Sequence, residues 1–321
     1  MEKTYELMPN AKMLLSSLRS VGYTEETAIA DIVDNSISSG ANTIQLYFDW
    51  DDQTILIADN GKGMQKKELL DSMKIGSSDP GVTRSASDLG RFGMGMKTAS
   101  FSLGKQLLVI TKQKDEINNA EWNLEYVENE DKWEILIHSD EKIDTYIKSK
   151  TDKIEFQNWD EGTLISLSML DKLIDENNMQ KSKVKFYKTV EKVKKHLAMI
   201  FHRFIEEDNL QIYVNKNLLE AWNPFIRQNP ATMELACEEL FDGKTSVSIE
   251  PYILPHKTKF EDEEAFKKAG GAKDWLAHQG FYVYRNRRLI VYGTWFGKFK
   301  KEPAYNLSLI HISEPTRLRR I

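Results

Sequence analysis

The sequence predicts an α/β fold, a two-layer sandwich in which helices cover one face of a mixed sheet, followed by a smaller α+β domain. Three observations predict it. An amphipathic helix pattern at 24–39 leads directly into two strand patterns, 43–50 and 54–58. Further strand patterns extend the same sheet. After Leu210 the pattern changes, which indicates a second domain.

The composition is that of an ordinary globular protein. The chain has 321 residues, 40% of them hydrophobic, which is enough to bury a sizeable core. A formal net charge of -5 gives no overall basic surface, so composition alone favours neither DNA nor a membrane. Cys237 is the only cysteine, which excludes internal disulfides and a cysteine zinc cluster. Without a long apolar run or a signal peptide, we expect a cytoplasmic protein with no membrane partner.

The first helix is expected at 24–39. Thr24 can cap it and Gly40 can end it, and its apolar positions form one stripe. A short helix is expected at 65–73. The polar segment 75–92 is rich in Gly, Ser and Asp. Loops of that length are uncommon unless they are functional, so we expect this segment to be a lid.

The remainder of the first domain completes the sheet and ends in a helix. We expect a helix at 93–103 and a long amphipathic helix at 181–206. The strand patterns between these helices are 106–112, 120–127, 131–138, 152–157 and 163–169. The first domain is therefore expected to span residues 1–206.

The second domain is expected at 207–306. Its strand-like segments are 212–215, 246–254, 280–284 and 288–292. Residues 307–317 are similar to one reading frame of a transposase sequencing adapter. We therefore expect 307–321 to be a non-native tail and the second domain to be truncated; the alternative is a genuine basic tail.

Three motifs with carboxylates or glycines follow one another along the first domain. The first is Asp31-Ile32-Val33-Asp34-Asn35-Ser36, on the first helix. Residues at i and i+4 share a helix face, so Asp31 and Asn35 can point into the same pocket. By itself this segment also fits an amphipathic helix whose acidic residues face solvent.

The second motif is Asp59-Asn60-Gly61-Lys62-Gly63-Met64, which follows the second strand. A carboxylate at the end of a strand can accept a hydrogen bond from the exocyclic amine of adenine, and the two glycines let the backbone pass close to the base. Guanine would instead place a carbonyl opposite the carboxylate. Asp-Asn-Gly is also a common turn, so this motif is weak alone.

The third motif is Gly90-Arg91-Phe92-Gly93-Met94-Gly95-Met96-Lys97-Thr98. Its glycines allow backbone amides to wrap phosphates, and the helix that follows directs its N-terminal amides at an anion. Lys97 is expected to pair with a phosphate, the alternative being a residue on the helix surface. A P-loop is rejected because Met96 separates Gly95 from Lys97 and because the preceding segment is polar.

In this order, and with Glu161-Gly162-Thr163 leading into a later strand, the motifs resemble the N, G1 and G2 boxes of the gyrase, heat-shock chaperone, histidine kinase and MutL (GHKL) ATPase superfamily. The resemblance implies a Bergerat-type fold that binds ATP and Mg²⁺. It implies that Asp31 activates the attacking water, that Asn35 binds the magnesium ion, and that Thr163 supports Asp59 and a water at adenine. The other nucleotide-binding positions that it implies are Asp34, Gly61, Gly63, Met64 and the G2 residues from Gly90 to Lys97.

The first motif departs from the family pattern at Asp31, where a glutamate is usual, and at Ser38, where an aspartate is common. A shorter general base motivates one alternative, an ATP-gated binding module that hydrolyses little ATP. A chaperone-like ATPase is a second alternative. A histidine kinase is rejected, because no histidine lies in a helical dimerisation segment ahead of the ATPase motifs.

The second domain resembles the S5-type transducer domain of MutL-like and MORC-like proteins, in Tyr213-Val214-Asn215 and in Gly280 to Ile290. In those families a transducer lysine reaches the γ-phosphate, and Lys298 or Lys300 occupies the corresponding position. The overall resemblance is to prokaryotic MORC-like proteins. It implies slow ATP hydrolysis, lid closure, an ATP-dependent homodimer, and a DNA or effector-protein partner.

Overall fold

The computed structural model describes residues 10–20, 22–76, 95–241, 246–271, 275, 277–298 and 308–314. The described residues form two compact units. The first unit runs to Lys194 and also contains Gln211–Leu219, and the second contains Lys195–Leu210 and the residues from Glu220 on. Within the described ranges, no helix combines the length and the apolar character needed to cross a membrane.

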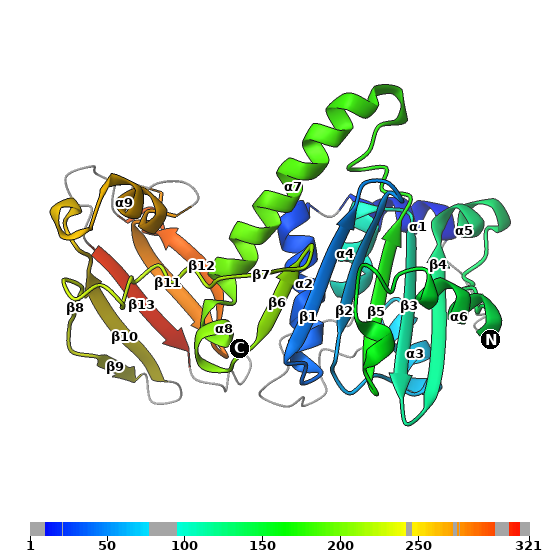
Figure 1. Ribbon diagram of the computed structural model, residues 1–321, viewed down its shortest axis with the longest axis horizontal. Coiled ribbons are helices and arrows are strands. Elements are labelled where there is room, and N and C mark those ends of the chain that lie inside the picture. Colours follow the sequence, from blue (N-terminus) through cyan, green and yellow to red (C-terminus); the bar gives the residue numbers. More distant parts are fainter. Residues whose placement is uncertain are drawn as a thin grey trace, which may run out of the picture. The chain divides into compact units, whose positions relative to one another are not determined.

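The first unit is built on a mixed sheet of seven strands in the order β4-β3-β5-β2-β1-β6-β7 (Figure 1). The strands are β1 (Thr43–Asp49), β2 (Thr54–Asp59), β3 (Gln106–Gln113), β4 (Glu116–Asn123), β5 (Gly162–Ser168), β6 (Gln211–Val214) and β7 (Asn217–Leu218). Neighbouring strands are antiparallel except β1 and β6, which are parallel. The predicted mixed sheet with its α/β fold is therefore confirmed.

The helices of this unit are α1 (Ala11–Arg19), α2 (Glu25–Ser38), α3 (Lys66–Met73), α4 (Gly95–Leu103), α5 (Leu124–Glu130), α6 (Asp140–Lys148) and the part of α7 (Met179–Ile200) up to Lys194, with 3₁₀ turns η1 (Phe156–Asn158) and η2 (Glu176–Asn178). Thr24 caps α2 as predicted, since its side chain accepts from the N–H of Thr27. Gly40 ends that helix with a φ of 81°. α2 packs against α4, and Ser36 of α2 bonds Asp59 of β2.

The opposite face of the sheet is also covered, which the sequence analysis does not predict. Leu56 and Ala58 of β2 pack there with Leu164 of β5 and with Ile143 and Ile147 of α6. Side chains alternate between faces along a strand, so Asp59 points to the face that carries α2. β2 is consequently buried along its whole length.

Three predicted strands differ from the structure. The strand expected at 120–127 is β4, which ends at Asn123 because that residue caps α5, accepting from the N–H of Tyr126 at 3.1 Å. Residues 131–138 form only one bridge, between Leu136 and Glu121. Residues 152–157 form turns that lead into η1. Ile154 and Phe156 of this segment are buried in the cluster that α6 forms with the sheet.

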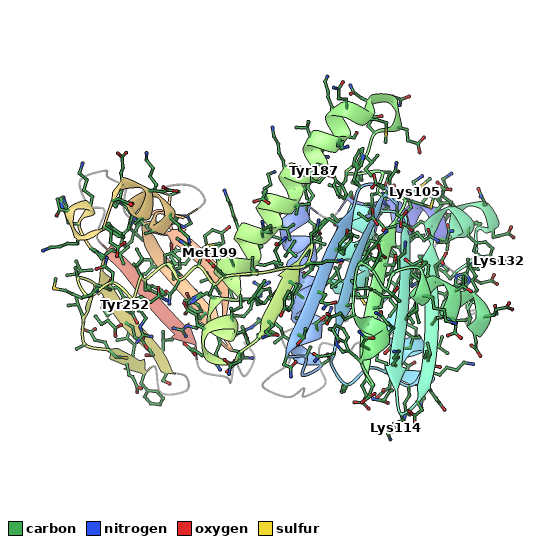
Figure 2. The ribbon with its side chains drawn as sticks, viewed as in Figure 1. Lys105, Lys114, Lys132, Tyr187, Met199 and Tyr252 are labelled. Carbon is green, nitrogen blue, oxygen red and sulfur yellow. The ribbon has the colours of Figure 1, made fainter. Side chains whose placement is uncertain are left out.

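The second unit contains a sheet in the order β12-β11-β13-β10-β8, with β9 paired to β10. Its strands are β8 (Met233–Glu234), β9 (Glu238–Phe241), β10 (Ser246–Ile253), β11 (Gly280–Arg285), β12 (Arg288–Thr294) and β13 (Ser308–Glu314), and its helical segments are α8 (His202–Glu207), η3 (Lys257–Lys259) and α9 (Glu263–Ala269). Its core includes Tyr252, labelled in Figure 2, whose ring lies 4.5 Å from that of Phe225. His202 shares a hydrogen bond of 2.7 Å with the hydroxyl of Tyr284.

The structure divides the chain differently from the predicted boundary at 206/207. The long helix expected at 181–206 is interrupted at Phe201, between α7 and α8. Residues 211–214, expected in the second domain, form β6 parallel to β1 and so extend the first sheet. The adapter-like segment contributes β13, which pairs with β10 and β11. Backbone pairing requires no particular side chains, so an alternating apolar segment is enough to form such a strand.

A buried charge cluster fixes the β1–β2 turn to the segment that follows α6. Lys153 bonds the carboxylates of Asp49 and Asp52, and Asp49 is only 6% exposed at its side chain. We expect Lys153→Met to lower the free energy of unfolding by about 2 kcal/mol, because it leaves a buried carboxylate without its cation. Urea denaturation measures the loss.

Lys74→Met is the matched control for this prediction, since Lys74 pairs with the exposed Asp71. It should cost less than about 0.5 kcal/mol, as is typical of surface pairs. Equal losses in the two variants would show that the cluster around Asp49 contributes nothing beyond a surface ion pair.

Candidate functional site

Asp59 is a buried carboxylate at the end of β2, and it is 4% exposed. Its Oδ2 accepts from the hydroxyl of Ser36 at 2.8 Å, and its Oδ1 accepts from the N–H of Gly61 at 2.9 Å. Burial raises the pKa of Asp59, while the bonds from Ser36 and Gly61 act in the opposite direction. Both oxygens are therefore held in one fixed orientation.

The loop after Asp59 passes through a tight space at two glycine positions. A Cβ on Gly61 would lie 1.9 Å from Oγ of Ser39, and one on Gly63 would lie 1.9 Å from the carbonyl oxygen of Lys112. Gly63 also has a φ of 62°, which favours glycine. The second motif is thus a tight backbone passage between α2 and β3, and the expected close approach to adenine stays a prediction.

Thr163 lies directly opposite Asp59, as its partner in the pairing of β5 with β2. Its backbone N–H also bonds the Asp59 carboxylate, and its hydroxyl lies 3.4 Å from that of Thr111. The Thr111 oxygen accepts from the N–H of Met64 at 2.8 Å. Thr111 is fully buried and escaped the sequence analysis. The one feature of the sequence that could have pointed to Thr111 is its polar side chain next to the apolar residues of β3.

Asp31 and Asn35 lie one helical turn apart on α2, Asp31 half-buried and Asn35 exposed. The Asp31 carboxylate accepts from the hydroxyl of Tyr23 at 2.7 Å. The side-chain nitrogen of Asn35 donates to the backbone oxygen of Asp31 at 3.1 Å, which leaves the amide oxygen as the atom suited to a cation. Asp34 is 8% exposed and belongs to the buried side of α2. Sequence reasoning missed Tyr23.

The third motif lies partly outside the described residues, which exclude Gly90, Arg91, Phe92, Gly93 and Met94. Its described part, Gly95 and Met96, opens α4 in half-buried positions. A Cβ on Gly95 would lie 4.0 Å from Oδ2 of Asp31. The start of α4 and the first motif are therefore neighbours.

Lys97 is buried within the domain, with 2% of its surface exposed. Its ammonium group donates to the backbone oxygen of Ser72 in α3 at 2.5 Å. Burial lowers the pKa of Lys97 to about 8. The structure thus directs this charge at α3, which contradicts the solvent-facing alternative, and the phosphate contact expected for Lys97 stays a prediction.

Lys298 belongs to the second unit, where it is exposed just after β12. Its described contact is between its backbone N–H and the oxygen of Trp295, at 2.9 Å. Lys300 lies outside the described residues. The role given to a transducer lysine stays a prediction.

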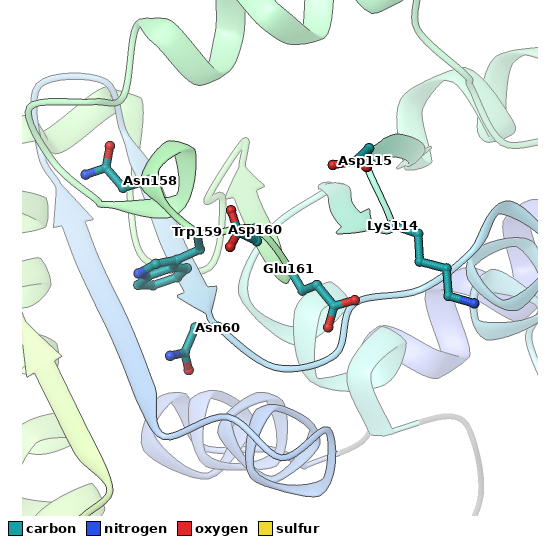
Figure 3. A pocket seen from close by; sticks show the side chains of 7 residues that line it. All are labelled: Asn60, Lys114, Asp115, Asn158, Trp159, Asp160 and Glu161. Carbon is teal, nitrogen blue, oxygen red and sulfur yellow. The ribbon is translucent and has the colours of Figure 1, made fainter.

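A pocket of about 580 Å³ opens beside the chain segments that flank Asp59 (Figure 3). It is lined by Asn60, Lys114, Asp115, Asn158, Trp159, Asp160 and Glu161. Lys112 fixes one wall by donating to the backbone oxygens of Phe156, Gln157 and Trp159. None of the predicted site residues lines this pocket, so it is distinct from the site assembled around Asp59.

Comparison with known proteins agrees with this geometry. Residues 23–160, which contain all three motifs and end just before Thr163, match a family described as histidine kinase-, DNA gyrase B-, and HSP90-like ATPase. Residues 23–160 are therefore a GHKL ATPase domain.

Relatives of this ATPase domain occur among MORC proteins. The chain is 33% identical over 121 residues to ATPase morc-1 of Caenorhabditis elegans, a match covering 36% of this chain and 14% of that protein. It is 28% identical over 109 residues to MORC family CW-type zinc finger protein 3 of Mus musculus, covering 32% of this chain and 11% of the relative. It is 25% identical over 119 residues to ATPase MORC2 of Homo sapiens, a match covering 35% of this chain and 11% of that protein. The matches thus span a small part of each relative.

The glycine passage of the ATPase domain gives a direct prediction. Gly63→Ala should lower the free energy of unfolding by about 3 kcal/mol or more, because the added methyl group meets a backbone oxygen and the φ becomes strained. Gly76→Ala shares the positive φ of 76° but has open space around it, so it should cost about 1 kcal/mol. Urea unfolding of both variants tests this. Similar losses would mean that the passage relaxes around a methyl group.

Lys97 gives a prediction about pH. Its pKa is about 8 in the folded domain and near the ordinary 10.5 in the unfolded chain, so between these values the unfolded state binds more protons. The stability of the wild type relative to Lys97→Met should therefore rise with pH from 8 to 10, by up to about 1.4 kcal/mol per pH unit. Below pH 8 the difference should be constant. Urea unfolding at four pH values measures it, and a flat difference would contradict the burial of the charge.

Proposed function

We propose that the ATPase domain binds ATP with Mg²⁺ and hydrolyses it slowly to ADP and phosphate. The observation that carries this proposal is the Asp59 carboxylate, which is buried and held by Ser36 and Gly61 beside a tight loop that contains Gly63. A buried carboxylate is costly unless its acceptor positions are used. An exocyclic amine donor such as that of adenine fits this group.

The hydrolytic step is assigned to Asp31. A water oxygen attacks the γ-phosphorus, the bond from phosphorus to the β,γ-bridging oxygen breaks, and ADP leaves with the electron pair. The carboxylate of Asp31 accepts the proton that the water loses. The position of Asp31 beside the start of α4 supports this assignment, because the amides at a helix N-terminus favour the phosphates of a nucleotide there.

Asn35 is the residue proposed to hold magnesium, through its side-chain oxygen. Magnesium would supply positive charge at the phosphates and takes few ligands from the protein. The donation from the Asn35 nitrogen to Asp31 supports this assignment, because it turns the amide oxygen away from the helix backbone.

The larger cycle is a further part of the proposal. Lid closure by residues 75–92, ATP-dependent dimerisation, a transducer role for the second unit with Lys298, and a link to DNA are all inferred from the resemblance to MORC-like and MutL-like proteins. The names of the relatives support the ATPase part, since ATPase morc-1 and ATPase MORC2 are named for it.

A nucleotide-gated binding module with little turnover is the second candidate function. Asp31 favours it, because the side chain is one methylene shorter than glutamate and already accepts from Tyr23. Turnover by the wild type above that of Asp31→Ala separates the two functions.

The proposal predicts different failures for its two carboxylates. Asp59→Asn should weaken ATP binding about 100-fold or more, since an amide donor would then face the adenine amine. Asp31→Ala should bind ATP within about 3-fold of the wild type and lose about 100-fold or more in turnover. Calorimetry with Mg²⁺ measures binding and phosphate release measures turnover.

Asp71→Asn is the matched control for these substitutions, because Asp71 lies on α3 in an exposed ion pair. It should leave both measurements unchanged. A folded wild type that binds no ATP would overturn the proposal.

A further inference from the structure

Tyr23 joins the first motif to α4 through its hydroxyl group. It lies two residues before α2 and is half-buried. The hydroxyl donates to Oδ2 of Asp31 at 2.7 Å, and the side chain of Thr98 in α4 also hydrogen-bonds it. The hydroxyl oxygen of Tyr23 therefore connects Asp31 of α2 with Thr98 of α4.

The surroundings of the Tyr23 hydroxyl keep it protonated. Burial, followed by the bond to Asp31 and its charge, raises the pKa of Tyr23 to about 12. The phenol consequently keeps its proton throughout any ordinary assay range and remains a donor to Asp31.

Asp31 needs such a restraint more than a buried residue would. It lies half-exposed on α2, where a short carboxylate can adopt more than one rotamer, and in the structure its Oδ2 lies toward Gly95. A carboxylate has about four acceptor positions, so one bond from a phenol orients it without using its capacity to accept another proton.

We propose that Tyr23 is a positioning residue for ATP hydrolysis, which holds Oδ2 of Asp31 toward the start of α4 and links it to Thr98 of that helix. This inference rests on the proposed function, because it requires Asp31 to act as the general base. It also explains how a shorter acid is held in place: the phenol fixes the direction of the side chain from a neighbouring segment.

Tyr23→Phe is the first test, since it keeps the ring and removes the hydroxyl. The rate of phosphate release at saturating ATP should fall about 10-fold, as expected for loss of a hydrogen bond to a charged group. ATP affinity should stay within about 2-fold. Tyr126→Phe is the matched control, because Tyr126 also bonds a carboxylate, Glu134 at 3.1 Å, but on the exposed surface of α5. It should retain the wild-type rate.

The deciding test repeats Tyr23→Phe in an Asp31→Asn background, using single-turnover phosphate release with enzyme in excess. A residue that acts through Asp31 should cause no further loss there, whereas a merely structural residue should cause the same fold-loss in both backgrounds. Equal losses, or an unchanged rate in the single variant, would overturn the inference. If Tyr23→Phe does not fold, Thr98→Val replaces it, with a smaller loss expected only when Asp31 is present.

Failure of this inference is distinguishable from failure of the proposed function. If the wild type and Tyr23→Phe hydrolyse ATP at the same rate, the proposed ATPase function stands and only the positioning role of Tyr23 is excluded. A wild type that binds ATP without any turnover above Asp31→Ala excludes both the general base and the residue that positions it.

Discussion

The burial of the Asp59 carboxylate is the constraint on which the rest of the site depends. Removing a carboxylate from water is unfavourable unless hydrogen bonds replace its hydration. Here the hydroxyl of Ser36 and the N–H of Gly61 supply them, so α2 must lie against the end of β2 and the following loop must turn sharply. The same turn leads to Gly63, which has to pass beside the backbone of Lys112. One buried charge thereby fixes the positions of a helix, a strand end and a loop.

α2 carries this constraint to the other half of the site. Ser36 bonds Asp59, and Asp31, five residues earlier on the same helix, lies beside the start of α4. Because a helix is rigid over such a distance, the positions of the Asp59 carboxylate and of the proposed general base are coupled. The capping of α2 by Thr24 sets where the helix begins. It therefore also sets that Ser36 faces Asp59 and that Asp31 faces the start of α4.

Much of this arrangement could be predicted from local signals. The cap at Thr24, the glycine at Gly40 and the apolar stripe located α2, and the order of the motifs indicated the GHKL fold. Contacts between segments that are far apart in the chain have no such local signal in the sequence. Thr111 is one threonine in a strand, Tyr23 is one aromatic residue before a helix, and only the folded chain brings them to Met64 and Asp31. Strand partners are equally non-local, which is why β6 could not be recognised as a neighbour of β1.

Lys97 shows how the same limit affects a charge. Its position after the third motif suggests a phosphate ligand, yet its ammonium group is buried and donates to Ser72. α3 and α4, the two helices that flank the predicted lid, are thus joined at one point by a buried cation. Because burial lowers the pKa of Lys97 to about 8, holding the ammonium group in the folded domain has a cost that disappears as the lysine loses its proton above pH 8. The other end of the site meets the same helix, because Gly95 at the start of α4 adjoins Asp31 of the first motif.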